Sequence, residues 1–154
     1  RLGTAVDPAR ALWPVQYVVI GRAGGRLSWD GQRFSGVRHG VGAPLGYVVS
    51  QRLQALGVLA SESMAPPKAL GMVAAGRLDG YVLEREIALD LLDQLQLQEQ
   101  LVLLPTPLLE TEWHLPFSHP FYAAHGDVAE RFWRALGEQR EKHDDELRRR
   151  YLNR

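Results

Sequence analysis

The sequence predicts an α/β fold with a mainly parallel sheet that is covered by helices on both faces. Short apolar runs alternate along the chain with segments whose apolar residues recur at helical spacing. Strands that alternate with helices imply crossover connections between parallel strands. Hydrophobic residues make up 45% of the 154 residues, which is enough to build a core. No run approaches the ~20 apolar residues that a membrane helix needs.

The first half of the chain alternates between strand and helix. A β-branched run at 17–22 predicts a strand, and a second short strand is expected at 37–43. Residues 47–56 carry apolar side chains near helical spacing, and Gly57 suits the C-terminal end of that helix. The apolar segment 58–60 predicts a further short strand.

The second half continues the same alternation. Pro66 and Pro67 suit the first turn of a helix over 66–75, because proline lacks the N–H that this turn leaves unpaired. We expect the remaining elements to be a strand at 78–84, an amphipathic helix at 85–96, strands at 101–105 and 108–117, and a helical end from about 127.

An unusual segment, Gly-Arg-Leu-Asp-Gly (76–80), follows the helix at 66–75 and runs into the next strand. Gly76 ends the helix, because glycine lacks the Cβ that penalises a left-handed backbone. We interpret Arg77 as a cation at the helix end and Asp79 as a turn residue. Both residues are therefore predicted to be structural.

Charge and composition exclude several classes of function. Lys and Arg together number 18, as do Asp and Glu, so the formal net charge is zero and gives no support for a nucleic-acid partner. The absence of cysteine excludes disulfides, cysteine catalysis and thiolate metal sites. His114 and His119 lack further ligands at a defined spacing, so no metal site and no cofactor are expected. We find no convincing acid–base pair and predict no catalytic residues.

Six segments, taken in order, resemble the motifs of one family. They are DPAR (7–10), YVVIGRAGG (17–25), FSGVRHGVGAPLGYVVSQRL (34–53), LGMVAAGRLDGYVLE (70–84), HLPFSH (114–119) and FWRALGEQREKHDDELRRRYL (132–152). In this order they resemble the bacterial family 3 extracellular solute-binding proteins, the periplasmic receptors that serve ABC importers for amino acids and similar solutes. The resemblance implies a type II periplasmic-binding fold.

The resemblance also implies how the chain is organised. Residues 1–16 would end lobe 1 and include the crossing segment, 17–109 would form a complete lobe 2, and 110–154 would return to lobe 1 with the C-terminal helices. Most of lobe 1 would then lie upstream. We therefore expect either a separate upstream segment that completes lobe 1 or self-association through the ends of the chain.

Ligand-binding residues are implied at the carboxyl ends of three strands. Gly46 and Tyr47 stand where the family holds a ligand carboxylate at a helix N-terminus, with Tyr47 in place of a small hydroxyl residue; Tyr47 either contacts the ligand or fills the crevice. Ser63 and Met64 follow another strand, where the alternative role of Ser63 is a helix cap. Glu84 matches the position of an aspartate that pairs with the ligand's α-ammonium group.

The function implied is binding without chemistry. The expected protein is a periplasmic receptor that captures a small polar solute, an amino acid or a related molecule, for an ABC permease or a membrane sensor. Two alternatives share the architecture: a periplasmic enzyme of the cyclohexadienyl dehydratase type, and the effector-binding domain of a LysR-type regulator. No metal, cofactor or nucleic acid enters the favoured interpretation.

Overall fold

The computed structural model describes residues 10–44, 48–61 and 64–151, and the chain divides into two compact units. The core unit is residues 16–110, and the end unit is residues 1–15 together with 111–154. These boundaries lie within one residue of those expected for lobe 2. The assignment of the two units to two lobes remains a prediction.

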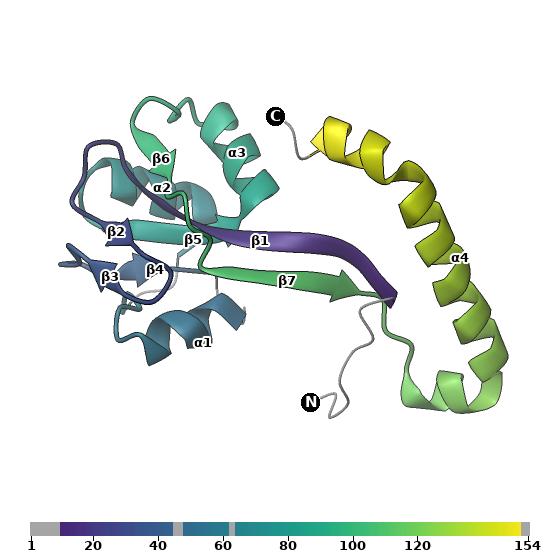
Figure 1. The fold of residues 1–154 in the computed structure, drawn as a ribbon. Helices are drawn as coiled ribbons and strands as arrows, with labels where there is room; N and C mark the ends of the chain where they lie inside the picture. The colour runs from purple at the N-terminus through teal and green to yellow at the C-terminus, as the bar shows by residue number, and fades with distance from the viewer. Residues whose placement is uncertain (1–9, 45–47, 62–63, 152–154) are drawn as a thin grey trace. The chain divides into compact units, whose positions relative to one another are not determined.

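A mixed sheet forms the centre of the core unit (Figure 1). Its strands lie in the order β4 (Val41–Gly42), β5 (Gly80–Glu84), β1 (Ala11–Arg22) and β6 (Leu101–Leu103). β4 and β5 are parallel, whereas β1 pairs antiparallel with both β5 and β6. Leu59 adds a parallel bridge to β4. The expected mainly parallel sheet is thus present in β4, β5 and β6, and β1 runs against them.

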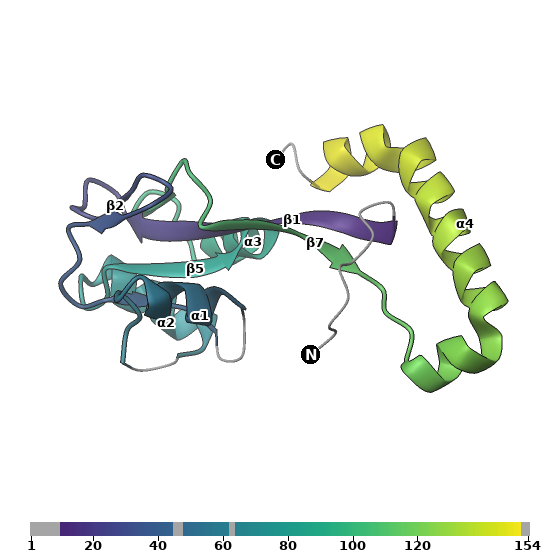
Figure 2. The same ribbon diagram turned by 60° about the horizontal axis from the view of Figure 1, so that its bottom comes forward.

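Three helices cover this sheet: α1 (Val48–Ala55), α2 (Pro66–Ala74) and α3 (Arg85–Gln94). α2 and α3 pack on the face that carries Tyr81 and Leu83, and Figures 1 and 2 show α1 on the other side of the sheet from α3. The buried cluster under α2 and α3 consists of Val18, Ile20, Ala69, Leu70, Val73, Leu78, Tyr81, Leu83, Ala88, Leu92 and Leu101.

The opposite face of the sheet is buried as well. Val19 and Val82 alternate with the residues of that cluster along β1 and β5, and neither is exposed to solvent. Val49 and Leu53 of α1 are equally buried. A sheet with two buried faces explains why its strands consist of continuous apolar runs rather than alternating ones.

Glycine ends two of these helices as the sequence predicts. Gly57 follows α1 with φ +70°, and Gly76 follows α2 with the same φ. The N–H of Gly57 bonds to the carbonyl of Gln54 at 3.0 Å, and that of Val58 bonds to the carbonyl of Leu53 at 3.1 Å. A left-handed residue after the helix lets these carbonyls find partners, which is the usual reason for glycine there.

A small hairpin follows β1, formed by β2 (Ser28–Trp29) and β3 (Phe34–Ser35). The Asp30 carboxylate accepts the N–H groups of Arg33 at 2.7 Å and Gln32 at 2.8 Å, and these hydrogen bonds lower the pKa of Asp30. The rings of Trp29 and Phe34 lie 4.4 Å apart across the pair. The hairpin is therefore held by its turn and by one aromatic contact.

The end unit contains the last part of β7 (Leu109–His114), a strand that pairs with β1, and the long helix α4 (His119–Tyr151). α4 begins eight residues before the expected start at 127 and has a non-helical residue at His125 (φ −139°, ψ 38°). Of the α4 side chains that the structure describes, only Ala129 is buried. None of the helices in the described part of the chain is long and apolar enough to cross a membrane.

Candidate functional site

The candidate site lies at the carboxyl edge of the core sheet. β4 and β5 are parallel, so their carboxyl ends meet at one edge, which is the usual position of ligands in open α/β sheets. Gly46 and Tyr47 follow β4, Ser63 and Met64 follow the bridge at residue 59, and Glu84 ends β5. Gly46, Tyr47 and Ser63 lie outside the described residues, so their proposed contacts stay predictions.

Glu84 caps helix α3. Its backbone is extended (φ −61°, ψ 139°), and its two carboxylate oxygens accept the N–H groups of Glu86 at 3.2 Å and Ile87 at 3.0 Å. A negative side chain at this position satisfies two otherwise unpaired donors and complements the helix dipole. A carboxylate offers about four acceptor positions, so capping uses half of them. Glu84 is held rigidly at the sheet edge and retains acceptor capacity.

Met64 is held at the same edge by a tyrosine of β5. The hydroxyl of Tyr81 donates to the carbonyl oxygen of Met64 at 2.7 Å, and the half-buried Met64 side chain packs against the core cluster. Burial raises the pKa of Tyr81 to about 12, because the charged phenolate would lose its hydration. The Tyr81 hydroxyl thus joins β5 to the segment before α2 by a hydrogen bond. The spacing of residues in the sequence did not indicate this contact.

The ring of Tyr81 also lies close to β4. A Cβ built on Gly42 would lie 2.8 Å from Cδ2 of the Tyr81 ring, well inside van der Waals contact. Glycine at 42 therefore lets the Tyr81 ring lie across β4. Farther along, the hydroxyl of Ser50 donates to the carbonyl of Pro44 at 3.0 Å and ties the end of the described β4 loop to α1.

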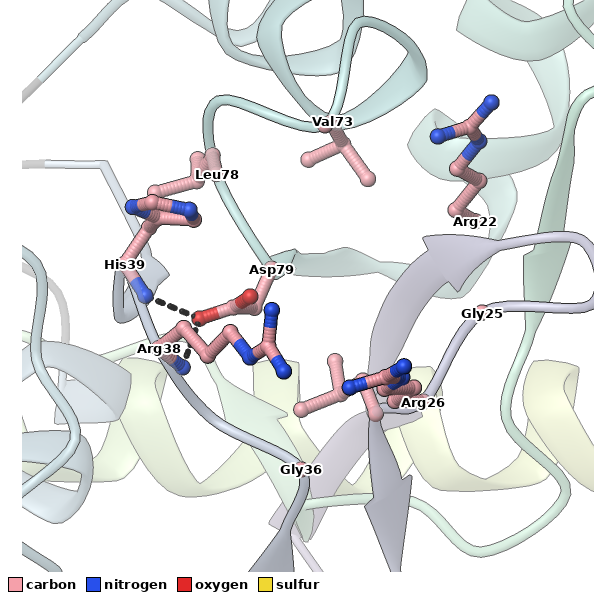
Figure 3. Close-up of a pocket in the computed structure, with 11 residues that line it drawn as sticks. Arg22, Gly25, Arg26, Gly36, Arg38, His39, Val73, Leu78 and Asp79 are labelled. Carbon is pink, nitrogen blue, oxygen red and sulfur yellow. Dashed lines mark hydrogen bonds between the residues drawn. The ribbon is translucent and has the colours of Figure 1, made fainter.

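Asp79 has a structural role at the opposite end of β5, as the sequence predicts. One carboxylate oxygen, Oδ2, accepts the backbone N–H groups of Arg38 at 2.6 Å, Gly40 at 2.9 Å and His39. Figure 3 shows the bonds from Arg38 and His39. The Asp79 N–H in turn donates to the carbonyl of Gly40 at 3.1 Å. The residue does more than make a turn, because it fixes the segment that leads into β4. The reason for an aspartate just before β5 is this contact.

Beside Arg85, whose Nη1 lies 3.7 Å from Oε1 of Glu86, the described groups at the carboxyl edge include the Glu84 carboxylate and backbone carbonyls, which accept hydrogen bonds. Such groups suit a cationic or amine-bearing ligand. In the described part of the chain, no group of three or more His, Cys, Asp or Glu side chains is arranged to hold a metal ion.

Comparison with known proteins was made by sequence and by structure. No family model matches the sequence, and no curated protein matches it. Solved structures do match. A histidine kinase sensor domain described as similar to periplasmic binding proteins gives a TM-score of 0.67 at 16% identity, covering 90% of this chain and 59% of its own.

Two further structures agree. A binding component of an ABC transporter from Wolinella succinogenes, complexed with lysine, gives a TM-score of 0.64 at 17% identity over 92% of this chain and 60% of its own. The GluR0 ligand-binding core from Nostoc punctiforme, in complex with L-glutamate, gives 0.56 at 15% identity over 87% and 68%. The fold is that of the type II periplasmic binding proteins.

The type II fold confirms the fold class that the sequence resemblance implied. The chain spans about three fifths of the sensor domain and of the Wolinella protein. At identities of 15–17%, these likenesses show the fold alone.

Proposed function

We propose that this chain belongs to a solute-binding receptor that captures a small polar solute with an amino group, such as an amino acid, at the carboxyl edge of the core sheet. The receptor works by binding and release and performs no chemistry. Its expected setting is the periplasm, where it would deliver the solute to an ABC permease. The observation that carries the proposal is the type II fold with an acidic side chain, Glu84, at the carboxyl end of β5.

The geometry of Glu84 supports this choice of ligand. Capping α3 holds the carboxylate in one orientation, so little rotamer entropy is lost when a ligand binds. The remaining acceptor positions suit an ammonium group, since charge-assisted hydrogen bonds are about twice as strong as neutral ones. Two proteins of this fold are described in complex with lysine and with L-glutamate, which agrees with amine recognition.

A membrane sensor is the second candidate partner. The structural neighbour with a TM-score of 0.67 is the sensor domain of a histidine kinase, so the same fold also serves signal input. The two roles share the ligand-binding step and differ in the protein that reads the bound state. Co-purification from membranes with a permease or with a kinase would separate them.

Calorimetry on the longest natural form of the protein tests the proposal. A panel of lysine, arginine, glutamate and glutamine should contain at least one ligand, and its N-acetylated analogue should bind far more weakly. Glu84→Gln should weaken the amine ligand by about 1.5–3 kcal/mol, the scale of a hydrogen bond to a charged group. Glutamine keeps an oxygen that can still cap α3, so the fold should persist.

Glu99→Gln is the matched control, because Glu99 is exposed in a turn after α3 and its loss of charge is the same. Affinity should be unchanged in this variant. Equal affinity of Glu84→Gln and the unaltered protein for every ligand found would remove Glu84 from the site. Failure of the whole panel to bind would contradict amino-acid recognition.

A further inference from the structure

A second cavity lies at the amino end of β5, within the core unit. Its volume is about 220 Å³, and it is bordered by the end of β1, the segment before β4 and the residues after α2. This volume is far more than one water molecule needs and lies below the range of about 300–1,000 Å³ that is common for sites of drug-sized ligands. The cavity therefore suits a small polyatomic ligand.

Three arginines line this cavity, which we call the arginine pocket: Arg22, Arg26 and Arg38. Figure 3 shows Arg26 and Arg38 along one border and Arg22 at another. Within the described part of the chain, none of the three guanidinium groups forms a hydrogen bond or an ion pair. The acidic residue of the lining is Asp79, and one oxygen of its carboxylate already accepts three backbone N–H groups. The pocket therefore carries an excess of positive charge in a chain whose formal net charge is zero.

The backbone holds these arginines in place. Asp79 binds the N–H of Arg38, and the N–H of Gly25 bonds to the carbonyl of Arg22 at 2.9 Å. Gly36 has φ +78°, and a Cβ there would lie 2.1 Å from the carbonyl oxygen of Arg26, so only glycine lets the two segments meet. The backbone around the pocket is thus fixed by contacts that do not use the guanidinium groups, and the three arginine side chains are themselves exposed.

A structural role at a helix end accounts for one of the three arginines. Nη1 of Arg22 lies 3.4 Å from a Cβ built on Gly76, just after α2, where the helix dipole favours a cation. Arg26 and Arg38 stand on loops and have no such explanation. Two unpaired cations along one border of the cavity, with Arg22 at another, favour an anion that carries more than one charge.

The arginine pocket is separate from the candidate solute site. Asp79 and Gly80 lie at the amino end of β5, and Glu84 lies at its carboxyl end. The five steps along the chain from Asp79 to Glu84, at about 3.3 Å each, place these two residues about 16 Å apart. The two ends also differ in their balance of charge, since three arginines and one aspartate border the pocket, whereas Glu84 lies beside a single arginine, Arg85, at the carboxyl end.

From these observations we infer that the arginine pocket binds a small multivalent anion through phosphate or carboxylate groups. Guanidinium groups present paired N–H donors that match both oxyanions bidentately. Binding here would be independent of the solute at the carboxyl edge, and each site has its own test.

Titration of the purified 154-residue chain with inorganic pyrophosphate, at low ionic strength, tests the inference. Saturable binding at one site is expected, with citrate also binding and acetate at least about tenfold weaker because it carries one charge. Arg26→Gln and Arg38→Gln should each weaken pyrophosphate binding about tenfold or more. Arg38→Lys keeps the charge and should show a smaller loss, because it lacks the planar fork.

Arg52→Gln is the matched control, since Arg52 is exposed in the last turn of α1 and lies outside the pocket. Its affinity for pyrophosphate should stay within about twofold of the unaltered chain. Urea unfolding should show that all variants remain folded, because the backbone contacts of the pocket are unchanged. Binding that never saturates, or an equal loss in Arg52→Gln, would overturn the inference in favour of general charge attraction.

Discussion

At the scale of single residues, a carboxylate at each end of β5 binds backbone N–H groups of a neighbouring segment. Asp79 precedes the strand and holds the segment before β4, and Glu84 ends it and caps α3. Both side chains therefore stabilise the connections around β5, on which the sheet order depends. Glu84 is in addition the proposed ligand residue, whereas Asp79 is structural alone.

Replacing Asp79 tests its role directly. Asp79→Ala leaves three N–H groups without their acceptor and should lower the free energy of unfolding by about 2 kcal/mol, since hydrogen bonds to charged groups are worth more than neutral ones. Urea unfolding measures the change. Asp93→Ala is the control, because Asp93 is exposed and accepts one side-chain bond from Gln98. It should change stability by less than about 0.5 kcal/mol. Equal losses of stability in Asp79→Ala and Asp93→Ala would contradict this role of Asp79.

Tyr81 predicts a dependence of stability on alkaline pH. Tyr81→Phe removes the hydrogen bond to Met64 and should cost about 1 kcal/mol at neutral pH. The folded-state pKa of about 12 exceeds the usual value of about 10, so the stabilisation by neutral Tyr81 is complete below pH 10 and is lost as pH rises from 10 through 12. Phenylalanine does not titrate there.

The stability difference between the unaltered chain and Tyr81→Phe should therefore shrink as the pH rises through that window. Urea unfolding in neutral and in strongly alkaline buffer gives the four values required. Tyr17→Phe provides a comparison on β1. A stability difference between these two proteins that stays constant with pH would show that ionisation of Tyr81 does not lower the stability at alkaline pH.

At the scale of elements, the contact between β4 and β5 depends on a glycine, Gly42, which has no Cβ to meet the Tyr81 ring. β4 has two residues, Val41 and Gly42, and Gly42 lies against the Tyr81 ring. Because the contact is steric and the φ of Gly42 is not positive, an added methyl group would push the two strands apart. Helix α2 contains the opposite case, since Gly71 has no atom within 4 Å of the position of its missing Cβ.

These two glycines form a matched pair of variants. Gly42→Ala should lower stability by about 1–3 kcal/mol through overpacking against Tyr81. Gly71→Ala should raise stability by about 0.8–1 kcal/mol, because alanine favours the helix and meets open space. Thermal unfolding of both variants measures these two changes in stability. The same sign of change in both would refute the steric account of β4.

At the scale of the whole molecule, the end unit buries little. Phe121, Val128 and Phe132 of α4 are 38%, 43% and 43% exposed, and Trp113 of β7 is 48% exposed. Phe117 contacts three aromatic rings of α4 at 5.2–5.6 Å and gathers them into a patch. Exposed apolar surface of this kind promotes association. This agrees with the expectation that the ends of the chain either self-associate or pack against another segment.

We therefore predict that the 154-residue chain associates with increasing concentration, or else leaves α4 poorly protected. Light scattering should show a mass that rises with concentration, and hydrogen exchange should be faster in α4 than in β1 and β5. The double variant Val128→Ser/Phe132→Ser should reduce association. Ile87→Ser is the control, as Ile87 is 47% exposed on α3 of the core unit. A strict monomer with α4 as protected as the core strands would refute the prediction.

The sequence by itself determined the class of fold, most elements and several of their ends. Apolar periodicity distinguishes α1, α2 and α3 from the strands, and the glycines at 57 and 76 mark helix ends, because these signals are local in the chain. The structural role of Asp79 could also be predicted from the sequence, since aspartate is a common turn residue. The early start of α4 at His119 was missed, because Pro120 and the break at His125 interrupt its pattern.

Only the tertiary structure decided which segments meet. β1 runs against its neighbours, and side-chain periodicity is the same in either strand direction. The hydrogen bond from Tyr81 to Met64 and the approach of Gly42 to the Tyr81 ring depend on atoms whose positions follow from packing. The arginine pocket is the clearest case, since its three arginines stand on segments that come together only when the sheet has formed. Local propensity specifies elements, whereas the burial of both sheet faces specifies their partners.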